Sequence, residues 1–525
     1  MYFIKNSFTP LRILHIFLQR GDIMFAKVIS CSVFGINGYI VNVEIDVSNG
    51  LPMFNIVGLG DTAISESRER VKSAIKNSGF DIFPKRIVVN LSPADLRKEG
   101  TLFDLPVAVS LLSAYGYVKE KKTEEFMIVG ELSLDGKIKR VDGIINSVIT
   151  AKQNGIKGII LPYENRDEAA VIKGIEIYPV KTLKECINFI NGEEEVEKYE
   201  IEFKPTEKSY EIDFRDVKGQ EKAKRAMEIA AAGGHNFMMI GSPGAGKSML
   251  AKRIVTILPQ LSEEEMIEST KIYSISGLLG KKNPIVDERP FRAPHHTSSD
   301  VAIIGGGRFP KPGEISLSHN GVLFLDEFGE FSKSVIEVLR QPLEDKVVTV
   351  SRALTTVEFP ADFILVAASN PCPCGYLFED GNSVKACVCS QYQIQNYHKK
   401  ISGPILDRMD MYIEIKKIPD EKLFKYGDGE SSEKIRERVE EAREVQRKRY
   451  GKSKTNSAMS QDELKRYAAL DKESEEIMKS AVRNLGLSGR GFDKILKVAR
   501  TIADIEASEN IKKEHLIEAL GYRKM

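Results

Sequence analysis

Apolar and polar residues recur with two different spacings along residues 24–191, which predicts strands and helices that follow one another. Residues 41–47 alternate apolar and polar side chains with a period of two, as a half-buried strand does. Residues 158–162 form a short apolar run that also favours a strand, whereas residues 63–78 and 105–115 have the length and composition of helices. This alternation predicts an α/β domain.

A change of composition separates this domain from the rest of the chain. Residues 192–210 are acidic, are interrupted by Lys and Pro, and show no apolar period, so they are interpreted as a linker. A second α/β unit follows over residues 211–418. Residues 419–525 have helical spacing throughout, with a break rich in Gly, Ser and Lys at 451–457. We therefore expect three folded parts.

Residues 1–23 precede the first strand-like pattern, which begins at Met24. Their apolar run is short and interrupted, and no small-residue cleavage site follows it, so it does not predict a secretory signal. We interpret the segment as an upstream extension without a role in the fold. A helix lying on a membrane surface is the alternative.

Composition excludes some classes of protein. The 76 Lys and Arg residues balance 75 Asp and Glu residues, leaving a formal net charge of +1, so any attraction to nucleic acid must come from a local patch. No apolar run is long enough to cross a bilayer. Four of the six cysteines crowd into one short segment, which is unlike a secreted disulfide framework. We expect a cytoplasmic protein with no membrane partner.

A phosphate-binding loop follows the apolar run at residues 237–240 and precedes a predicted helix over 248–258. Its glycines let backbone N–H groups turn towards phosphate oxygens, its lysine can reach the β- and γ-phosphates, and its serine can ligate Mg²⁺. An ordinary glycine turn would not carry the whole G-x-x-x-x-G-K-S motif. The motif predicts that ATP and Mg²⁺ bind at Gly241, Ser242, Pro243, Gly244, Ala245, Gly246, Lys247 and Ser248.

Two further apolar strands end in polar residues suited to the same site. Residues 322–325 lead into Asp326 and Glu327, where the first carboxylate can hold Mg²⁺ and the second can act as general base towards the attacking water. Residues 363–368 lead to Asn370, whose amide can orient that water. The alternative is that Asp326, Glu327 and Asn370 are solvated residues at strand ends, where Asn is common.

Two arginines are candidates for charge stabilisation at the γ-phosphate. Arg408 lies between acidic residues at a helix-to-strand junction. One interpretation is an arginine finger that reaches the γ-phosphate of a neighbouring subunit, and the other is a surface ion pair. Arg490 opens the predicted helix over 492–505, from which a lid could bring it to the nucleotide. The adjacent His295 and His296 favour structural hydrogen bonds at a subunit boundary over a metal site.

These motifs, in this order, resemble the magnesium-chelatase-like AAA+ ATPases, and most closely their YifB/ComM branch. The resemblance rests on G-S-P-G-A-G-K-S, V-L-F-L-D-E, A-S-N-P-C-P-C-G, I-S-G-P-I-L-D-R-M-D and S-G-R-G-F-D-K-I-L-K-V-A-R, and it covers residues 24–525. It implies an α/β protein with an N-terminal Lon-protease-like domain, a central AAA+ P-loop domain and a C-terminal helical lid.

The resemblance also implies roles for single residues. Walker A would be residues 241–248 and Walker B residues 322–327. Asn370 would be sensor 1, Arg408 a finger acting on the neighbouring subunit, and Arg490 sensor 2. A ring of copies of the chain is implied, and we expect a hexamer.

The front domain resembles the proteolytic domain of Lon without its catalytic pair. A Ser–Lys dyad needs a hydroxyl nucleophile and a lysine base. The resemblance places Leu102 at the serine position and Ile145 at the lysine position, and neither side chain can do this chemistry. We expect a scaffold for assembly or partner binding, and this departure argues against an ATP-dependent protease.

Four cysteines form a C-x-C…C-x-C pattern, namely Cys372, Cys374, Cys387 and Cys389. Four thiolates at this separation can close a tetrahedral zinc site, and a metal would order a loop that has little core of its own. Reduced cysteines in a flexible insertion are the alternative.

The ATP-driven step is the open question. Residues 347–359 predict a β-hairpin inserted before sensor 1, with Lys346 or Arg352 near its tip, and residues 447–454 form a local basic run. Both features favour a ring that grips DNA, single-stranded or branched, by its phosphates. The resemblance to the YifB/ComM branch implies a DNA motor, such as a branch-migration helicase in natural transformation or recombination. A protein remodeller and a chelatase motor subunit are the alternatives, although chelatase motor subunits lack the fused front domain.

Overall fold

The computed structural model describes residues 24–523 except 59–61, 97, 99, 119–120, 202–209, 281–282, 308–309, 353–354, 379–385, 401–402, 418–428 and 452. The chain divides into two compact units, one assigned to Met1–Phe203 and Gly277–Pro284 and the other to Lys204–Ser276 and Ile285–Met525. The main division falls inside the predicted linker. Residues 1–23, interpreted as an extension, lie outside the described residues.

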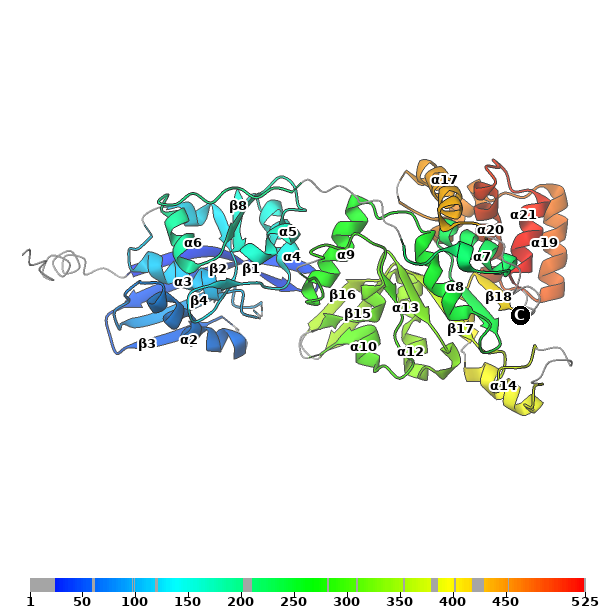
Figure 1. The fold of residues 1–525 in the computed structure, drawn as a ribbon, viewed down its shortest axis with the longest axis horizontal. Helices are drawn as coiled ribbons and strands as arrows, with labels where there is room; N and C mark the ends of the chain where they lie inside the picture. The colour runs from blue at the N-terminus through cyan, green and yellow to red at the C-terminus, as the bar shows by residue number, and fades with distance from the viewer. Residues whose placement is uncertain are drawn as a thin grey trace, which may run out of the picture. The chain divides into compact units, whose positions relative to one another are not determined.

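A seven-stranded mixed sheet forms the centre of the first unit (Figure 1), in the order β3-β4-β2-β1-β5-β8-β9. β1 and β2 form a long antiparallel hairpin, in which Val28 faces Val43. The apolar side chains of β2 are buried at every second position, as the period of two predicts. The strands are β1 (Met24–Phe34), β2 (Asn37–Ser48), β3 (Met53–Val57), β4 (Arg86–Ser92), β5 (Phe126–Ile128), β8 (Gly158–Pro162) and β9 (Glu176–Val180), with a small pair β6 (Glu131–Leu132) and β7 (Ile138–Lys139).

Helices pack on this sheet and complete its core. α3 is buried along nearly its whole length because its sequence is apolar on every side. α2 and α3 begin and end within one residue of the predicted ranges. The helices are α2 (Thr62–Asn77), α3 (Asp104–Ala114), α4 (Ile144–Gln153), α5 (Arg166–Ala169) and α6 (Leu183–Ile190), with 3-10 turns η1 (Lys121–Glu124) and η2 (Tyr163–Asn165).

The second unit is built on a five-stranded sheet in the order β11-β14-β17-β10-β18. Every pair in it is parallel, so all the strands end at one edge, and loops that follow them meet there. The strands are β10 (Phe237–Gly241), β11 (Phe291–Arg292), β14 (Val322–Leu325), β17 (Ile364–Ser369) and β18 (Met411–Ile415), with a small pair β12 (Gly305–Gly306) and β13 (Lys311–Pro312).

Helices surround this sheet (Figure 1). The helix after the phosphate loop ends at Arg253 and continues as a 3-10 turn, so it is shorter than the predicted range 248–258. The helices are α7 (Glu221–Gly233), α8 (Lys247–Arg253), α9 (Glu263–Ile275), α10 (Asp300–Ile304), α11 (Glu314–Leu317), α12 (Lys333–Val338), α13 (Arg340–Asp345), α14 (Gln391–Lys400) and α15 (Gly403–Leu406), with 3-10 turns η3 (Phe214–Asp216), η4 (Ile254–Thr256) and η5 (Phe328–Glu330).

The predicted hairpin is present as β15 (Val347–Arg352) and β16 (Thr355–Pro360), paired antiparallel. The prediction for Lys346 is wrong in one respect. Lys346 lies at the base of the hairpin and not near its tip, because its carbonyl accepts a hydrogen bond from the Ala361 N–H group, which closes the strands (2.8 Å). Arg352 is the last residue of β15, and its side chain lies outside the described residues.

The C-terminal segment is helical, as predicted, and belongs to the same compact unit as the five-stranded sheet. The main-chain N–H group of Tyr412 in β18 donates to the carbonyl oxygen of Tyr522 (2.7 Å), which joins the last helix to the sheet. The break after the first of these helices is made by Gly451, which takes a left-handed conformation. The helices are α17 (Ser432–Tyr450), α18 (Gln461–Tyr467), α19 (Lys472–Leu485), α20 (Gly489–Ile505) and α21 (Lys513–Gly521), with the 3-10 turn η6 (Asn456–Ala458).

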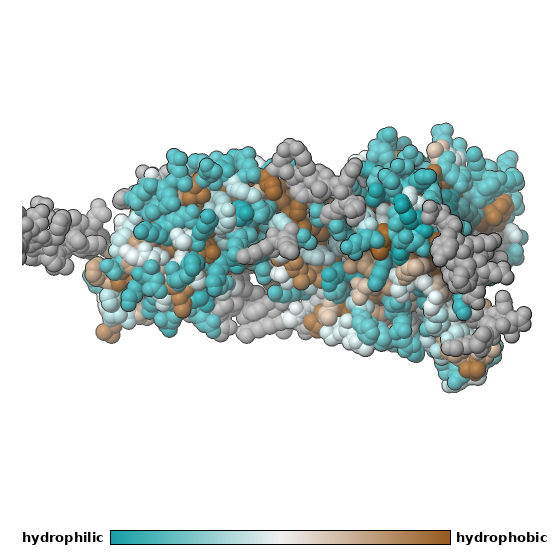
Figure 2. Space-filling model, in the orientation of Figure 1, coloured by the Kyte–Doolittle hydropathy of each residue, from teal (hydrophilic) through white to brown (hydrophobic). Residues whose placement is uncertain are grey.

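Hydrophilic residues cover most of the face drawn in Figure 2, and hydrophobic residues occur there in small groups. Among the helices that the structure describes, none combines the length and apolar character that crossing a membrane requires.

Candidate functional site

The loop from Gly241 to Ser248 turns sharply between β10 and α8. Gly244 and Gly246 have φ angles of 78° and 94°, which favour glycine. A Cβ atom at Gly241 would lie 2.3 Å from the Ile415 carbonyl oxygen of the neighbouring strand. The glycines of the motif are therefore needed for the path of the backbone itself. The loop lies at the carboxyl edge of the sheet, where ligands bind in such folds.

Lys247 is buried in this loop, and its ammonium group is held by three oxygens. It donates to the carbonyl oxygens of Gly241 (2.5 Å) and Ser242 (3.1 Å) and to Oδ1 of Asn370 (3.0 Å). Burial lowers the pKa of Lys247, while the carboxylates of Asp326 and Glu327 act in the opposite direction. The predicted sensor 1 is thus in direct contact with the phosphate-loop lysine.

The two predicted magnesium ligands come together. The Ser248 hydroxyl donates to Oδ2 of Asp326 (2.6 Å), and the N–H group of Glu327 donates to Oδ1 of the same carboxylate (2.9 Å). A hydroxyl and a carboxylate beside a phosphate loop are hard oxygen donors of the kind that Mg²⁺ prefers. This donor set fits a hydrated magnesium ion shared with the phosphates.

Glu327 is exposed and has a left-handed backbone, with a φ angle of 52°. Such a conformation is costly for a residue with a side chain, and at functional sites it often directs a reactive group. Oε2 of Glu327 lies 3.2 Å from Nδ1 of His296, which follows the neighbouring strand β11. Sequence reasoning missed this contact, because no local signal links a loop histidine to a carboxylate about thirty residues away.

Arg408 and Arg490 meet at a third residue that the sequence did not indicate. Both guanidinium groups contact the carboxylate of Glu344 in α13, Arg490 at 3.5 Å. Arg408 is buried, and it also donates to the Pro404 carbonyl oxygen (2.6 Å). The hydrogen bond from Arg408, helped by its positive charge, lowers the pKa of Glu344.

The position of this arginine pair is set by the strand direction of β18. Met411 of β18 is level with Phe237, and Ile415 is level with Gly241, so Arg408 precedes the strand at the amino edge of the sheet. The phosphate loop lies at the carboxyl edge. Within one chain, the structure therefore brings Lys247, Ser248, Asp326, Glu327 and Asn370 together and places Arg408 and Arg490 elsewhere.

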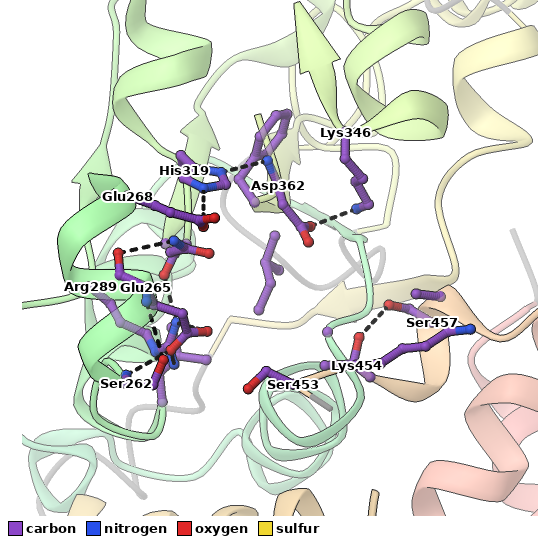
Figure 3. A pocket seen from close by; sticks show the side chains of 18 of the residues that line it. Ser262, Glu265, Glu268, Arg289, His319, Lys346, Asp362, Ser453, Lys454 and Ser457 are labelled. Carbon is purple, nitrogen blue, oxygen red and sulfur yellow. Dashed lines mark hydrogen bonds and ion pairs between the residues drawn. The ribbon is translucent and has the colours of Figure 1, made fainter. Parts of the chain in front are cut away.

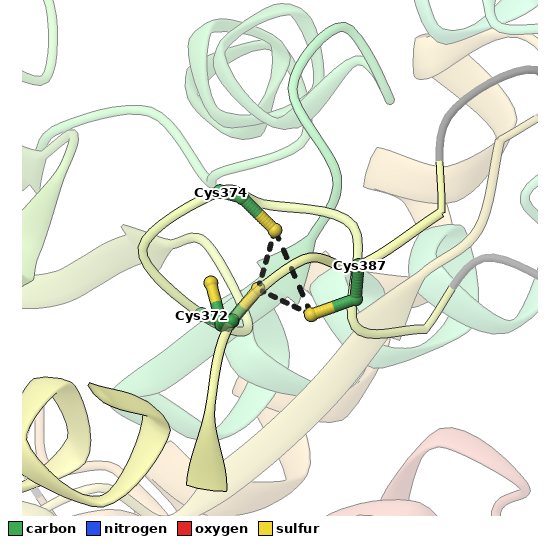
Figure 4. Close-up of side chains that lie close together, drawn as sticks. Cys372, Cys374 and Cys387 are labelled. Carbon is green, nitrogen blue, oxygen red and sulfur yellow. Dashed lines mark hydrogen bonds between the residues drawn. The ribbon is translucent and has the colours of Figure 1, made fainter. Parts of the chain in front are cut away.

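The four predicted metal-binding cysteines also come together, and all their sulfur atoms lie within 4.8 Å of one another. Figure 4 labels Cys372, Cys374 and Cys387 of this cluster. The Sγ atom of Cys372 lies 3.4 Å from that of Cys374 and 3.7 Å from that of Cys387, and the last two are 3.6 Å apart. All four thiols are free of disulfides. The cluster directly follows Asn370 in the chain.

A second, charged cavity of about 430 Å³ lies at the amino ends of the strands (Figure 3). Ion pairs across it join Arg289 to Glu265 (3.0 Å) and Lys346 to Asp362 (3.0 Å). Lys346 is therefore engaged inside its own chain. In the predicted basic run, Arg449 and Lys454 are likewise paired with Asp504 and Glu463.

The first unit carries apolar side chains at both positions of the expected dyad. Ile145 is completely buried in α4, and Leu102 packs against the core with its carbonyl oxygen accepting from Gly130 (2.9 Å). Neither position offers a nucleophile or a base, and the scaffold role of this domain stays a prediction.

Comparison with known families gives three consecutive matches. Residues 213–423 match the family "Magnesium chelatase, subunit ChlI", residues 43–165 match "Subunit ChlI of Mg-chelatase", and residues 429–523 match "Magnesium chelatase, subunit ChlI C-terminal".

Similar proteins span nearly the whole chain. The competence protein ComM of Haemophilus influenzae is 41% identical over 506 residues, 95% of this chain and 97% of that protein. The uncharacterized protein YifB of Escherichia coli is 43% identical over 493 residues, which are 93% of this chain and 95% of that protein. The chain belongs to the YifB/ComM family of magnesium-chelatase-like AAA+ ATPases.

A partial match extends to Lon. Lon protease 2 of Bacillus subtilis is 29% identical over 192 residues, 33% of this chain and 34% of that protein. Together with the mixed sheet of the first unit, this match supports a Lon-like front domain joined to an AAA+ P-loop domain. As a member of this family the protein is an ATP hydrolase that uses Mg²⁺.

Proposed function

We propose that this ATPase works as a ring of six copies, in which each ATP pocket is completed by arginines of the neighbouring copy, and that ATP hydrolysis there remodels DNA. The observation that carries the proposal is the separation of the site into two parts. The pocket of one chain contains its lysine, its magnesium donors and its base, while Arg408 and Arg490 lie together at the opposite edge of the same sheet.

Each residue of the pocket has a role in this reaction. Lys247 would bind the β- and γ-phosphates, and Ser248 and Asp326 would hold Mg²⁺, whose charge would offset that of the phosphates. Glu327 accepts a proton from the attacking water, and Asn370 holds that water or the γ-phosphate in place. Arg408 and Arg490 of a neighbour supply positive charge at the leaving group.

DNA is proposed as the polymer that the ring moves. The hairpin β15–β16 presents Arg352 at the end of its first strand, where a side chain can reach a phosphate backbone without reading its sequence. The printed name of one relative, a competence protein, favours a role in natural transformation or recombination, carried out in the cytoplasm. Because Lys346 is paired with Asp362 at the hairpin base, Arg352 is the stronger candidate of the two.

We also propose that the four thiols bind one zinc ion. Four sulfur atoms placed 2.3 Å from a shared zinc lie about 3.8 Å from each other in a tetrahedron. The Sγ–Sγ separations of 3.4, 3.7 and 3.6 Å in the structure are close to this value and far longer than a disulfide bond. A four-iron cluster would spread its thiolates over several metal ions and so needs wider spacing.

Remodelling of a folded protein is the second candidate function, since the front domain lacks the dyad and is available as a binding module. The ATPase rate, measured with and without forked or single-stranded DNA, distinguishes the two candidate functions. We expect forked DNA to raise the rate, and Arg352→Ala to abolish the increase while basal hydrolysis remains.

Lys513→Ala is the matched control, because it removes an exposed basic residue of the lid that is paired with Glu473. It should leave the response to DNA unchanged. A rate that DNA does not change but a folded protein raises would favour the remodeller. Electron microscopy with forked DNA and an ATP analogue tests the ring and its stoichiometry.

A further inference from the structure

The cysteine cluster lies in a segment that leaves the sensor strand and returns to it. Cys372 is two residues beyond Asn370, and Cys389 is two residues before α14. α14 then brings Tyr397 and His398 back to the same strand end. The Tyr397 hydroxyl lies 3.4 Å from that of Ser369, and Nε2 of His398 lies 2.9 Å from the Pro371 carbonyl oxygen.

The same segment touches the phosphate loop directly. Gly375, in the turn between Cys374 and the rest of the segment, has a φ angle of 85°. A Cβ atom there would lie 2.5 Å from Cδ of Pro243 and 3.8 Å from Cγ of Asn370. The backbone of the cysteine loop therefore packs closely against Pro243 of the phosphate loop and passes near Asn370.

These contacts surround the lysine that binds phosphate. Asn370 accepts a hydrogen bond from Lys247, and Asn370 is joined through Pro371 to Cys372, which is completely buried. The loop carries little apolar core of its own, so its shape depends on whatever holds the four sulfur atoms together. A shift of the loop would move Gly375 and Asn370 together.

We propose that the cluster formed by Cys372, Cys374, Cys387 and Cys389 is a metal-dependent clamp on the ATP pocket. This clamp depends on the zinc site put forward above as part of the proposed function. The zinc fixes the cysteine loop, the loop holds Gly375 against Pro243, and the adjoining strand end holds Asn370 beside Lys247. Zinc occupancy and nucleotide binding are then linked equilibria, so each stabilises the other.

The first test removes the metal. Full-length protein, purified with zinc and a thiol reductant, should contain one zinc ion per chain by mass spectrometry. Cys387→Ser combined with Cys389→Ser should lose the zinc and bind a fluorescent ATP analogue about tenfold more weakly, as expected for loss of an orienting contact. Cys186→Ala, which removes a buried thiol of the first unit, should change neither property.

The second test breaks the contact and leaves the thiols in place. Gly375→Ala should keep its zinc and weaken binding of the ATP analogue by about tenfold, because the new methyl group collides with Pro243. Gly486→Ala is the control, since Gly486 also has a positive φ angle but nothing within 4 Å of the added atom. When Pro243→Ala is already present, Gly375→Ala should add much less loss, which a double-mutant cycle measures.

The third test uses reciprocity and does not depend on any variant folding. Binding of a non-hydrolysable ATP analogue should slow the release of zinc to a coloured chelator several-fold. Wild-type protein without zinc would overturn both the zinc site and the clamp. Two results together would overturn the clamp and leave the zinc site intact. Zinc would be present but released at the same rate with and without the analogue, and Gly375→Ala would bind nucleotide with normal affinity.

Discussion

Glu327 illustrates how much of this site depends on one residue. It has a left-handed backbone directly after Asp326, and His296 contacts its carboxylate. The two acids at the end of the apolar strand were evident from sequence, because a strand places its last residues at a predictable edge. The contact with His296 was not evident from the sequence, because the position of this histidine depends on the pairing of β11 with β14.

We predict that Glu327→Gln binds ATP normally and hydrolyses it roughly 10²- to 10⁴-fold more slowly, since the amide cannot accept a proton from water. Binding of a fluorescent ATP analogue and steady-state phosphate release measure the two properties. Lys247→Ala is the contrasting variant, in which binding itself should be lost. Appreciable turnover by Glu327→Gln would refute the assignment of the general base.

At the scale of elements, the lid is attached to the sheet through a buried cluster of charged residues. Asp410, just before β18, contacts Nζ of Lys494 in α20 (2.9 Å) and Nδ1 of His235 (3.3 Å). These partners keep the pKa of Asp410 well below its ordinary value, although burial opposes them. The helix pattern of the lid was predictable, but its attachment was not, because Lys494 and Asp410 are far apart in the chain.

Asp410→Asn should lower the free energy of unfolding by about 3 kcal/mol at pH 7, because it leaves Lys494 buried without its countercharge. A carboxylate with a depressed pKa stabilises the fold above its unfolded-state pKa, and this contribution is lost as the pH falls towards the folded-state value. The difference from wild type should therefore be constant between about pH 5 and 7 and shrink below about pH 4.

Denaturant unfolding followed by circular dichroism measures this effect. Asp407→Asn provides the control, because Asp407 is exposed on the same turn. An equal loss in both variants would show that the buried ion pair contributes nothing specific.

At the scale of the whole molecule, the proposed ring follows from the opposite placement of pocket and arginines on one parallel sheet. Arg408 is buried against Glu344 in the single chain, whereas the Arg490 side chain is exposed, so a neighbour would reach Arg490 directly and Arg408 only after it leaves Glu344. This placement depends on strand order and direction, which no short motif reports.

Subunit mixing tests this arrangement. Arg408→Ala should bind ATP and lose hydrolysis by roughly 10³-fold or more, in the range of other arginine fingers. Mixed with Glu327→Gln, it should recover part of the turnover, because some interfaces then combine an intact base with an intact arginine. A mixture that stays as inactive as its two components would contradict action between subunits.

Sequence alone determined the features that depend on neighbouring residues. The strands and helices, the phosphate loop, the acidic strand end and the paired cysteines are local patterns, and backbone geometry converts them directly into structure. Tertiary structure decided which distant side chains meet. It brought His296 to Glu327, gathered Arg408 and Arg490 at Glu344, placed Lys346 at the hairpin base, and pressed Gly375 against Pro243. Such contacts depend on how the elements pack, and packing reflects the whole chain at once.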